Sequence, residues 1–344
     1  MLKRFFSVLL AMFVSVIGFF PSSSLNDILN KGDITGRSDL ISVDDRDLPD
    51  FEVGADGIFT VLQITDTHFF NGIWYKDTKT LFAIKEQIIA LKPDLVIATG
   101  DIFDGYNDNI FYNKYSAIAK LAFLFEELEQ YWAYIPGNND GEFKGSADDI
   151  AACLAEYGYC LLSDVPDLSG AANYTLSIKS GGETVHSLLL TDSGMRDETG
   201  RHRAFQPDQV EWAARTLSEI KAVAPGAKVS VFYHANTPAF CDAGASGSAY
   251  KAGYGKIPAD LDNNGVPENT PIDEALRGSG IVTLVSVGHY HPSVNWCSLY
   301  ESTYYHLTRA SGYQATNKPG AALINIDTNG TAAQEIYTFT EIVF

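Results

Sequence analysis

The sequence predicts an α/β protein whose parallel strands are joined by helices. Short runs of β-branched and aliphatic residues recur along the chain, and helix-length segments with apolar residues at helical spacing separate several of them. Strands that alternate with helices indicate parallel pairing through crossover connections. Several of the runs also end in Asp, Asn or His. Because such proteins place their chemistry at the carboxyl ends of the strands, these polar residues are the first candidates for a functional site.

The first half of the chain alternates regularly. Leu81, Ile84 and Ile88 share one helical face, and Pro93 ends that helix. A β-branched run ends at Asp66, and an aromatic run leads into Pro136-Gly137. The elements expected here are strands at 58–65, 94–100 and 131–135 and helices at 78–91 and about 112–130.

The second half repeats the pattern and then changes to short strands from residue 294 onward. Ser180-Gly181-Gly182 predicts a hairpin turn, and Pro207 suits the first turn of a helix. Thr270 is a good helix cap, with Asp273 three positions later. The elements expected here are strands at 174–179, 184–191, 228–234 and 281–288 and helices at about 207–222 and from 270.

The N-terminus reads as a secretory signal peptide over residues 1–24. Lys3-Arg4 precedes sixteen uncharged residues, 5–20, and then Pro21 and three serines. We therefore expect an exported protein without stable membrane insertion once this segment is removed; an uncleaved anchor is the alternative. Residues 25–57 are polar and read as an irregular lead-in, and 58–344 as a single domain.

Charge and cysteine content limit the partners and the compartment. A net charge of −19 disfavours binding to nucleic acid. The four cysteines suit an oxidising compartment, and Cys153 with Cys160 is the preferred disulfide pair. Asn173 and Asn329 begin glycosylation sequons.

Polar groups of one chemical kind end five apolar strands. Four of the seven histidines in the chain are among them. Carboxylates and imidazoles suit Fe, Zn or Mn, and seven ligands suit two ions that share a carboxylate. These candidate ligands are Asp66, His68, Asp101, Asn138, His234, His289 and His291.

The blocks Asp66-x-His68, Gly100-Asp101, Gly137-Asn138, His234 and Gly288-His289-x-His291 resemble, in order and spacing, those of the calcineurin-like metallophosphoesterases over about residues 58–330. The residues that flank these blocks are most similar to those of the purple-acid-phosphatase-29-like branch of this family. The resemblance implies a four-layer α/β/β/α sandwich with two mixed sheets. It implies a first metal on Asp66, His68, Asp101 and His291, and a second on Asp101, Asn138, His234 and His289, with Asp101 as the bridge. It also implies hydrolysis of phosphate esters by a hydroxide that bridges the two ions.

Two positions depart from the family pattern. Asp104 stands where purple acid phosphatases have a metal-binding Tyr, so no purple chromophore is expected. Asn139 stands where the family has a His that protonates the leaving oxygen. The candidate catalytic residues are Asp101, Asn139 and Asp140, with reduced general-acid assistance because an amide does not titrate. His202 or His306 could supply the missing acid.

Other candidates lie outside these blocks. Arg196 and His202 belong to a basic cluster that could draw in a phosphate. Asp260, Asp262 and Asn264 copy the first half of a calcium loop, although Pro271 stands where a bidentate Glu belongs. Core packing is the expected role of the aromatic residues near the blocks, with lining of the pocket as the alternative. These aromatic residues are Trp74, Tyr75 and Trp296.

The function expected is therefore a secreted phosphatase acting on a phosphorylated small molecule or phosphoprotein. Two alternatives stay open. One is a weak or inactive family member that binds phosphorylated ligands, which the exchange at Asn139 favours. The other is a phosphodiesterase.

Overall fold

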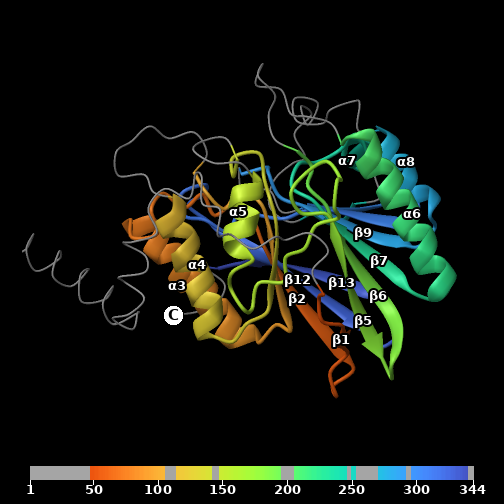
Figure 1. Cartoon of the computed structure of the whole chain (residues 1–344), viewed down its shortest axis with the longest axis horizontal. Helices are drawn as coiled ribbons and strands as arrows, with labels where there is room; N and C mark the ends of the chain where they lie inside the picture. The colour runs from red at the N-terminus through yellow and green to blue at the C-terminus, as the bar shows by residue number, and fades with distance from the viewer. Residues whose placement is uncertain are drawn as a thin grey trace, which may run out of the picture.

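The computed structural model describes residues 47–104, 114–141, 147–194, 205–245, 249–252, 270–291 and 296–339. Two mixed β-sheets lie face to face, and helices cover the outer side of each, so the layers follow the order α/β/β/α (Figure 1). The predicted fold class is confirmed. No helix among the described residues is both long and apolar enough to cross a membrane.

The five-stranded sheet has the strand order β13-β12-β2-β3-β4. Its three parallel strands, β2 (Ile58–Ile64), β3 (Leu95–Thr99) and β4 (Trp132–Ile135), are the apolar runs of the first half. β12 (Gly320–Asp327) and β13 (Ala332–Thr338) complete it as an antiparallel pair. The helices α3 (Tyr75–Leu91), α4 (Lys114–Glu127) and α5 (Ala147–Leu154) lie on its side of the molecule (Figure 1). Every residue of β3 is buried, as expected for a strand covered on both faces.

The eight-stranded sheet has the strand order β1-β5-β6-β7-β9-β11-β10-β8. Its centre is parallel and its flanks include the hairpins β5–β6 and β10–β11. The strands are β1 (Phe51–Glu52), β5 (Tyr174–Ser180), β6 (Glu183–Leu190), β7 (Lys228–Phe232), β8 (Ala249–Ala252), β9 (Val282–Val287), β10 (Trp296–Tyr300) and β11 (Thr303–Leu307). The helices on this side are α6 (Pro207–Val223), α7 (Pro238–Ala245) and α8 (Thr270–Gly278) (Figure 1).

A buried polar network joins the two sheets. Gln63 of β2 accepts hydrogen bonds from Ser286 of β9 and from Thr308, and it donates to Thr99 of β3 over 3.0 Å. The His306 ring lies 3.1 Å from the Ser286 hydroxyl and is fully buried. Burial lowers the pKa of His306 to about 3, so its imidazole is neutral and is not a proton donor at physiological pH. The network fixes the strand ends of both sheets relative to one another.

Several expectations differ from the structure. None of the four cysteines forms a disulfide, so the pairing of Cys153 with Cys160 is wrong. Core packing is confirmed for Trp296 but is wrong for Trp74 and Tyr75, which are exposed. β1 forms within the segment expected to be irregular, and α5, α7 and β8 were not expected. Residues 1–24, which were expected to form a signal peptide, lie outside the described part of the chain.

His186 is a core histidine with two polar neighbours. Its ring nitrogens lie 2.8 Å from the Gly330 carbonyl and 2.9 Å from the Ser230 hydroxyl, so it ties the β12–β13 turn to β6. Burial lowers its pKa from 6.5 to about 4. The unfolded chain therefore takes up a proton near pH 6.5, whereas the folded chain does so only near pH 4. The stabilisation that His186 provides is complete above pH 6.5 and is lost as the pH falls toward 4.

Replacing His186 with Gln should flatten the loss of stability in acid, because Gln does not titrate. The wild-type advantage in free energy of unfolding should shrink by roughly 3 kcal/mol between pH 7 and pH 4. Urea unfolding of both proteins in EDTA at each pH measures this difference. The wild type alone would not reveal this effect. Burial raises the pKa values of three carboxyl groups to about 6, and these groups stabilise the folded protein as the pH falls, opposite to His186. The three groups are Asp164, Asp192 and Asp273. A difference that stays constant with pH would contradict the assignment.

Candidate metal centre

The carboxyl ends of four parallel strands, two from each sheet, meet at one place. Asp66 and His68 follow β2, Asp101 follows β3, His234 follows β7, and His289 and His291 follow β9. Four of these residues have positive φ angles although they are not glycine: Asp66 (50°), His68 (48°), Asp101 (48°) and His289 (69°). Such strained backbone persists only where the surrounding structure imposes it, and it is common at functional sites.

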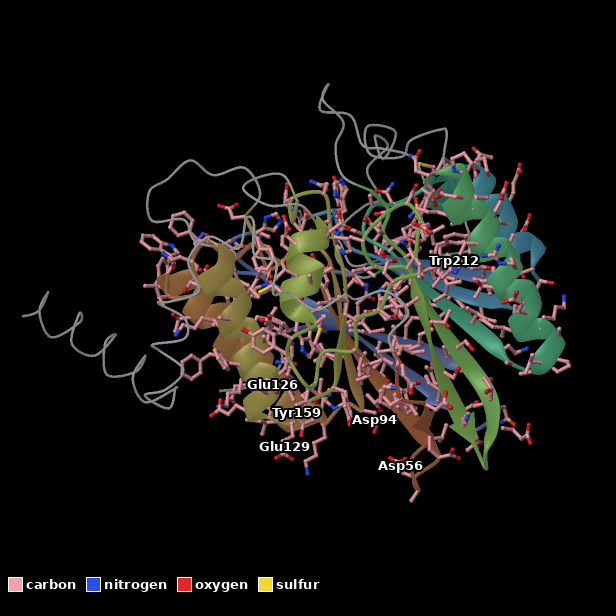
Figure 2. All side chains as sticks on the ribbon, viewed as in Figure 1. Asp56, Asp94, Glu126, Glu129, Tyr159 and Trp212 are labelled. Atoms are coloured by element: carbon pink, nitrogen blue, oxygen red, sulfur yellow. The ribbon has the colours of Figure 1, made fainter. Side chains whose placement is uncertain are left out.

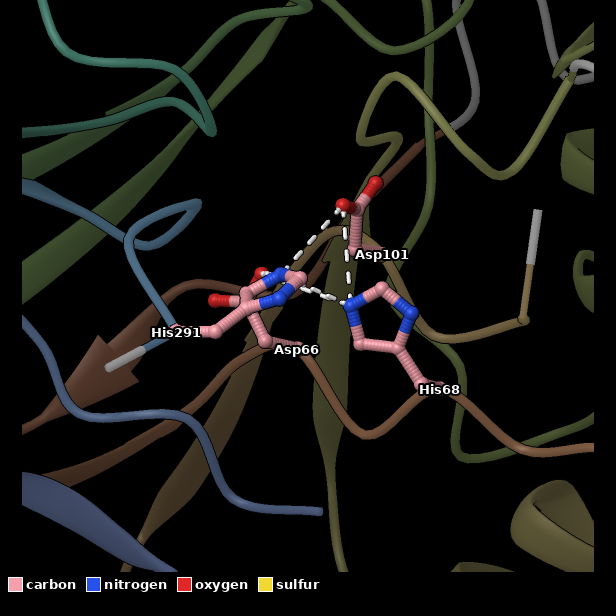
Figure 3. A group of neighbouring side chains, drawn as sticks. All are labelled: Asp66, His68, Asp101 and His291. Atoms are coloured by element: carbon pink, nitrogen blue, oxygen red, sulfur yellow. Dashed lines mark hydrogen bonds and ion pairs between the residues drawn. The ribbon is translucent and has the colours of Figure 1, made fainter. Parts of the chain in front are cut away.

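The first cluster contains Asp66, His68, Asp101 and His291, whose side chains point toward one another (Figure 3). The Nε2 atoms of His68 and His291 are 2.8 Å apart. His291 Nε2 lies 3.0 Å from Asp66 Oδ1 and 4.0 Å from Asp101 Oδ2. His68 Nε2 lies 3.8 Å from each carboxylate. Nitrogen and oxygen ligands about 2.0–2.2 Å from one ion give separations of this size.

The second cluster contains Asp101, His234 and His289. His234 Nε2 lies 3.2 Å from Asp101 Oδ2 and 3.1 Å from His289 Nδ1. The other nitrogen of His234, Nδ1, lies 2.8 Å from the Thr99 carbonyl oxygen. A proton on Nδ1 donated to that carbonyl leaves the lone pair of Nε2 facing Asp101, which is the usual arrangement of a metal-binding imidazole. Asp101 belongs to both clusters.

Asn138 and Asn139 form a chain of hydrogen bonds to Asp101. The Asn139 backbone N–H donates to Asp101 Oδ1 over 2.8 Å, and its amide Nδ2 donates to Asp101 Oδ2 over 3.0 Å. Asn138 Nδ2 donates to Asn139 Oδ1 over 2.9 Å. This bond fixes the Asn138 amide, whose oxygen is buried and has no hydrogen-bond partner. Asn139 therefore orients both a carboxylate and an amide of the site.

Two glycines allow the loops to approach closely. A Cβ at Gly137 would collide with the backbone N and the carboxylate of Asp101. A Cβ at Gly288 would collide with the Thr65 hydroxyl and approach Asp66. Both sites therefore require glycine, because only a residue without a side chain lets these loops pack against the carboxylates.

The charges of the site strongly favour a cation. Burial opposes ionisation of both carboxylates, but the neighbouring imidazoles together outweigh it, with His291 contributing most at Asp66 and His234 most at Asp101, so the pKa of each lies well below its usual range. Burial lowers the pKa of His234, but Asp101 outweighs burial and raises it to about 10. Without another cation the site would hold protons on His68 and His234, whose pKa values are raised. A metal ion would supply the same positive charge and displace those protons.

Asp140 lies behind the site and connects two loops. Its Oδ1 accepts hydrogen bonds from the backbone of Ile102 (2.8 Å) and Phe103 (3.1 Å), and its Oδ2 accepts from Gly137 (2.8 Å) and the Tyr134 hydroxyl (2.9 Å). Burial, followed by the charge of Asp101, raises the pKa of Asp140 to about 6. With both oxygens engaged, this placement favours a positioning role over proton transfer.

Two further side chains of the site, Ser193 and Thr65, were not predicted from the sequence. Ser193 Oγ accepts hydrogen bonds from the backbone N–H groups of His234 (3.3 Å) and Ala235 (3.0 Å), and Thr65 Oγ1 donates to Asp66 Oδ2 over 2.9 Å. Asp104, the residue at the tyrosine position, lies 3.9 Å from His68 Nδ1. The candidates that lie outside the described residues are Arg196, His202, Asp260, Asp262 and Asn264.

The residues present fit two metal ions. Asn138 Oδ1 and Asp66 Oδ1 are buried and lack a hydrogen-bond partner of acceptable geometry, although His291 Nε2 lies near Asp66 Oδ1. A buried oxygen without a partner costs about 1–3 kcal/mol unless something binds it. A cation in the first cluster, held by Asp66, His68, Asp101 and His291, would satisfy Asp66 Oδ1. A second cation would be held by Asp101, His234 and His289. Asn138, whose amide is bonded to Asn139 beside Asp101, is the fourth ligand expected from the sequence.

Comparison with known proteins agrees with this geometry. Residues 59–293 match the family model described as calcineurin-like phosphoesterase. A solved dimetal phosphatase from Danio rerio is similar with a TM-score of 0.57 and 13% identity, over 82% of this chain and 96% of that one. A structure described as GAP50, the anchor in the inner membrane complex of Plasmodium, has a TM-score of 0.51 and 11% identity, over 83% and 87%. At these identities the likeness concerns the fold. No curated protein matches the sequence.

Proposed function

Because the chain belongs to the calcineurin-like phosphoesterase family, we propose that it is a dinuclear metal-dependent phosphoesterase with weak general-acid assistance. The observation that supports this most directly is the pair of clusters that share Asp101. The residues that flank the five blocks support membership of the purple-acid-phosphatase-29-like branch. Its substrates are phosphorylated small molecules or phosphoproteins, and its N-terminal residues 1–24 direct it to export.

Two ions held by these residues would supply Lewis acidity and would lower the pKa of water at the site toward ~7. The chain itself holds the ligand atoms in place. The Thr99 carbonyl fixes the His234 tautomer, Asn139 orients Asp101 and Asn138, and Asp140 ties together the loops that carry Asp101 and Asn138.

Asn139 limits the chemistry that the site performs well. At the place of the leaving-group acid it offers an amide N–H, and this N–H already donates to Asp101. Leaving groups that depart without a proton, such as aryl oxides, lose little from this exchange. Alkyl oxides need the proton and lose the roughly 10²–10⁴-fold that a positioned acid contributes. The proposed enzyme therefore prefers esters of acidic alcohols.

The second candidate function is binding of phosphorylated ligands with little or no turnover. Asn139 favours it, since the residue serves the ligand set and not proton transfer. The solved structure described as an anchor is a protein of the same fold. The complete ligand set favours the enzyme instead, because binding alone does not require two ions.

Metal analysis combined with turnover tests the proposal. The purified chain should bind two equivalents of Fe, Zn or Mn, and EDTA should abolish hydrolysis of p-nitrophenyl phosphate. Metal supplied at about 1,000 times the Kd of each site should raise the free energy of unfolding by roughly 4 kcal/mol per bound ion, measured in urea. A panel of mono- and diesters separates phosphatase from phosphodiesterase. A metal-loaded chain that binds phosphate but hydrolyses no ester would contradict the enzyme and support the binding role.

A further inference from the structure

Exposed hydrophobic side chains concentrate on one segment. Seven large apolar residues are exposed among those the structure describes, and five of them lie between residues 73 and 89. They begin five residues after His68 and continue along the outer side of α3. The five are Ile73, Trp74, Tyr75, Phe82 and Ile89. A large exposed apolar patch often marks an interaction surface.

The loop that carries the first of these side chains is rigidly held. Asp77 Oδ2 accepts hydrogen bonds from the backbone N–H groups of Phe70 (3.0 Å), Asn71 (2.9 Å) and Gly72 (2.8 Å). Asn71 Oδ1 accepts from the backbone of Ile73 and Trp74. Ile73 and Trp74 are 54% and 49% exposed although this loop is fixed. These side chains are therefore held in exposed positions by an ordered loop.

The charge around this loop differs from that of the whole chain. The protein has 43 acidic and 24 basic residues, yet residues 73–92 contain four lysines against Asp77 and Glu86. Asp77 is buried and engaged by the loop, and Lys85 pairs with Glu127 at 3.2 Å. Lys76 lies beside the aromatic residues, as does Lys79, whose Nζ is 3.9 Å from the centroid of the Tyr313 ring. The acidic residues Glu126 and Glu129, at the C-terminal end of α4, and Asp94, just before β3, lie on the lower side of the molecule (Figure 2).

We define the Trp74 face as Ile73, Trp74, Tyr75, Lys76, Lys79 and Phe82. Tyr75, Lys79 and Phe82 lie at i, i+4 and i+7 and so share one side of α3. Trp and Tyr with neighbouring lysines are the residues that settle at a membrane–water interface. A second copy of the chain would bring the same lysines together in a symmetric contact, which is unfavourable.

We propose that the Trp74 face docks on an anionic lipid bilayer. The apolar side chains enter the headgroup region, and Lys76 and Lys79 approach the lipid phosphates. The strongly acidic remainder of the surface is repelled and turns away, so the protein binds in one orientation. This inference is independent of the proposed hydrolase activity, since it concerns a surface and not the metal centre.

Tryptophan fluorescence tests the proposal directly. The four tryptophans include one exposed residue, Trp74, because Trp132, Trp212 and Trp296 are 0%, 5% and 4% exposed. Vesicles of phosphatidylcholine with 30% phosphatidylglycerol should shift the emission of the full chain to shorter wavelength. They should also protect Trp74 from acrylamide, which quenches it in solution. Trp74→Phe should remove both signals without affecting folding.

Matched variants separate the face from the rest of the chain. Trp74→Asp should weaken co-sedimentation with these vesicles, whereas Val223→Asp should not, because Val223 is 87% exposed but lies on α6. Lys79→Glu should weaken binding roughly tenfold, since losing a lysine near such a surface costs about fivefold and the new carboxylate adds repulsion. Lys228→Glu, the same charge change on an exposed lysine at the start of β7, should leave binding intact.

Three outcomes would overturn the proposal. The full chain does not bind these vesicles. The full chain binds while Trp74 stays accessible to acrylamide, which assigns the contact to another segment, such as residues 5–20. The chain self-associates without lipid and Trp74→Asp makes it monomeric, which assigns the Trp74 face to a second copy.

Discussion

Replacing Asn139 with histidine is expected to raise turnover of an alkyl phosphate, such as glycerol phosphate, by about 10²-fold or more. The histidine would restore a titrating group at the position from which the leaving oxygen takes its proton. Turnover of p-nitrophenyl phosphate should rise less than about tenfold, because that leaving group departs without protonation. Steady-state kinetics on both esters, at equal metal content, measures the two ratios.

The histidine variant also loses hydrogen bonds that Asn139 makes, and a control variant must account for this loss. Asn139 also donates to Asp101 Oδ2 and accepts from Asn138 Nδ2, and histidine would lose at least one of these bonds. Asn139→Ala loses the side-chain bonds without gaining an acid, so the histidine variant is best compared with it. A gain of equal size on both esters, or on neither, would show that Asn139 does not stand in for a missing acid.

Replacing Asp101 with asparagine should have the largest effect of any single change at the site. Among the residues that the structure describes, Asp101 is the one carboxylate that belongs to both clusters, and its neighbours His234 and His68 lie 3.2 and 3.8 Å from Oδ2. A neutral amide cannot bridge two cations, so metal content should fall from two equivalents to one or none. Activity should fall by at least about 10³-fold, since electrostatic stabilisation by both ions is lost.

Asp94→Asn is the matched control for this variant. Asp94 lies at the opposite end of β3, at the lower edge of the molecule in Figure 2, and accepts a hydrogen bond from the Thr60 backbone over 2.7 Å. This variant should keep both ions and its activity. Elemental analysis of the two variants beside the wild type gives the stoichiometry. An Asp101→Asn protein that retains two ions and normal turnover would refute the bridging role.

The fold was predictable because its central strands are long apolar runs with polar ends. β2, β3 and β9 are buried along nearly their whole length, and such strands leave a clear pattern in the sequence. The elements that were not expected are short. α5 and α7 have eight residues each, and helices of this length depend on tertiary packing more than on local preference.

The grouping of the Asp and His side chains was predictable for the same reason, since the parallel strands of each sheet end at one edge. What surrounds them was not. The Thr99 carbonyl that faces His234 is a backbone atom, which any residue would offer. Asp140 looked like a member of the catalytic set because it follows Asn139, yet its four hydrogen bonds serve the loops. Spacing in a sequence places a residue near a site without fixing the direction of its side chain.

Neither sheet carries a complete set of ligands by itself. Asp66, His68, Asp101 and Asn138 follow strands of one sheet, whereas His234, His289 and His291 follow strands of the other. Each ion would therefore be bound by ligands from both sheets and would cross-link them at the edge where their strands end. The folding chain would bind its metals only after β7 and β9 have packed against the five-stranded sheet. Metal binding would therefore indicate that the two sheets have assembled.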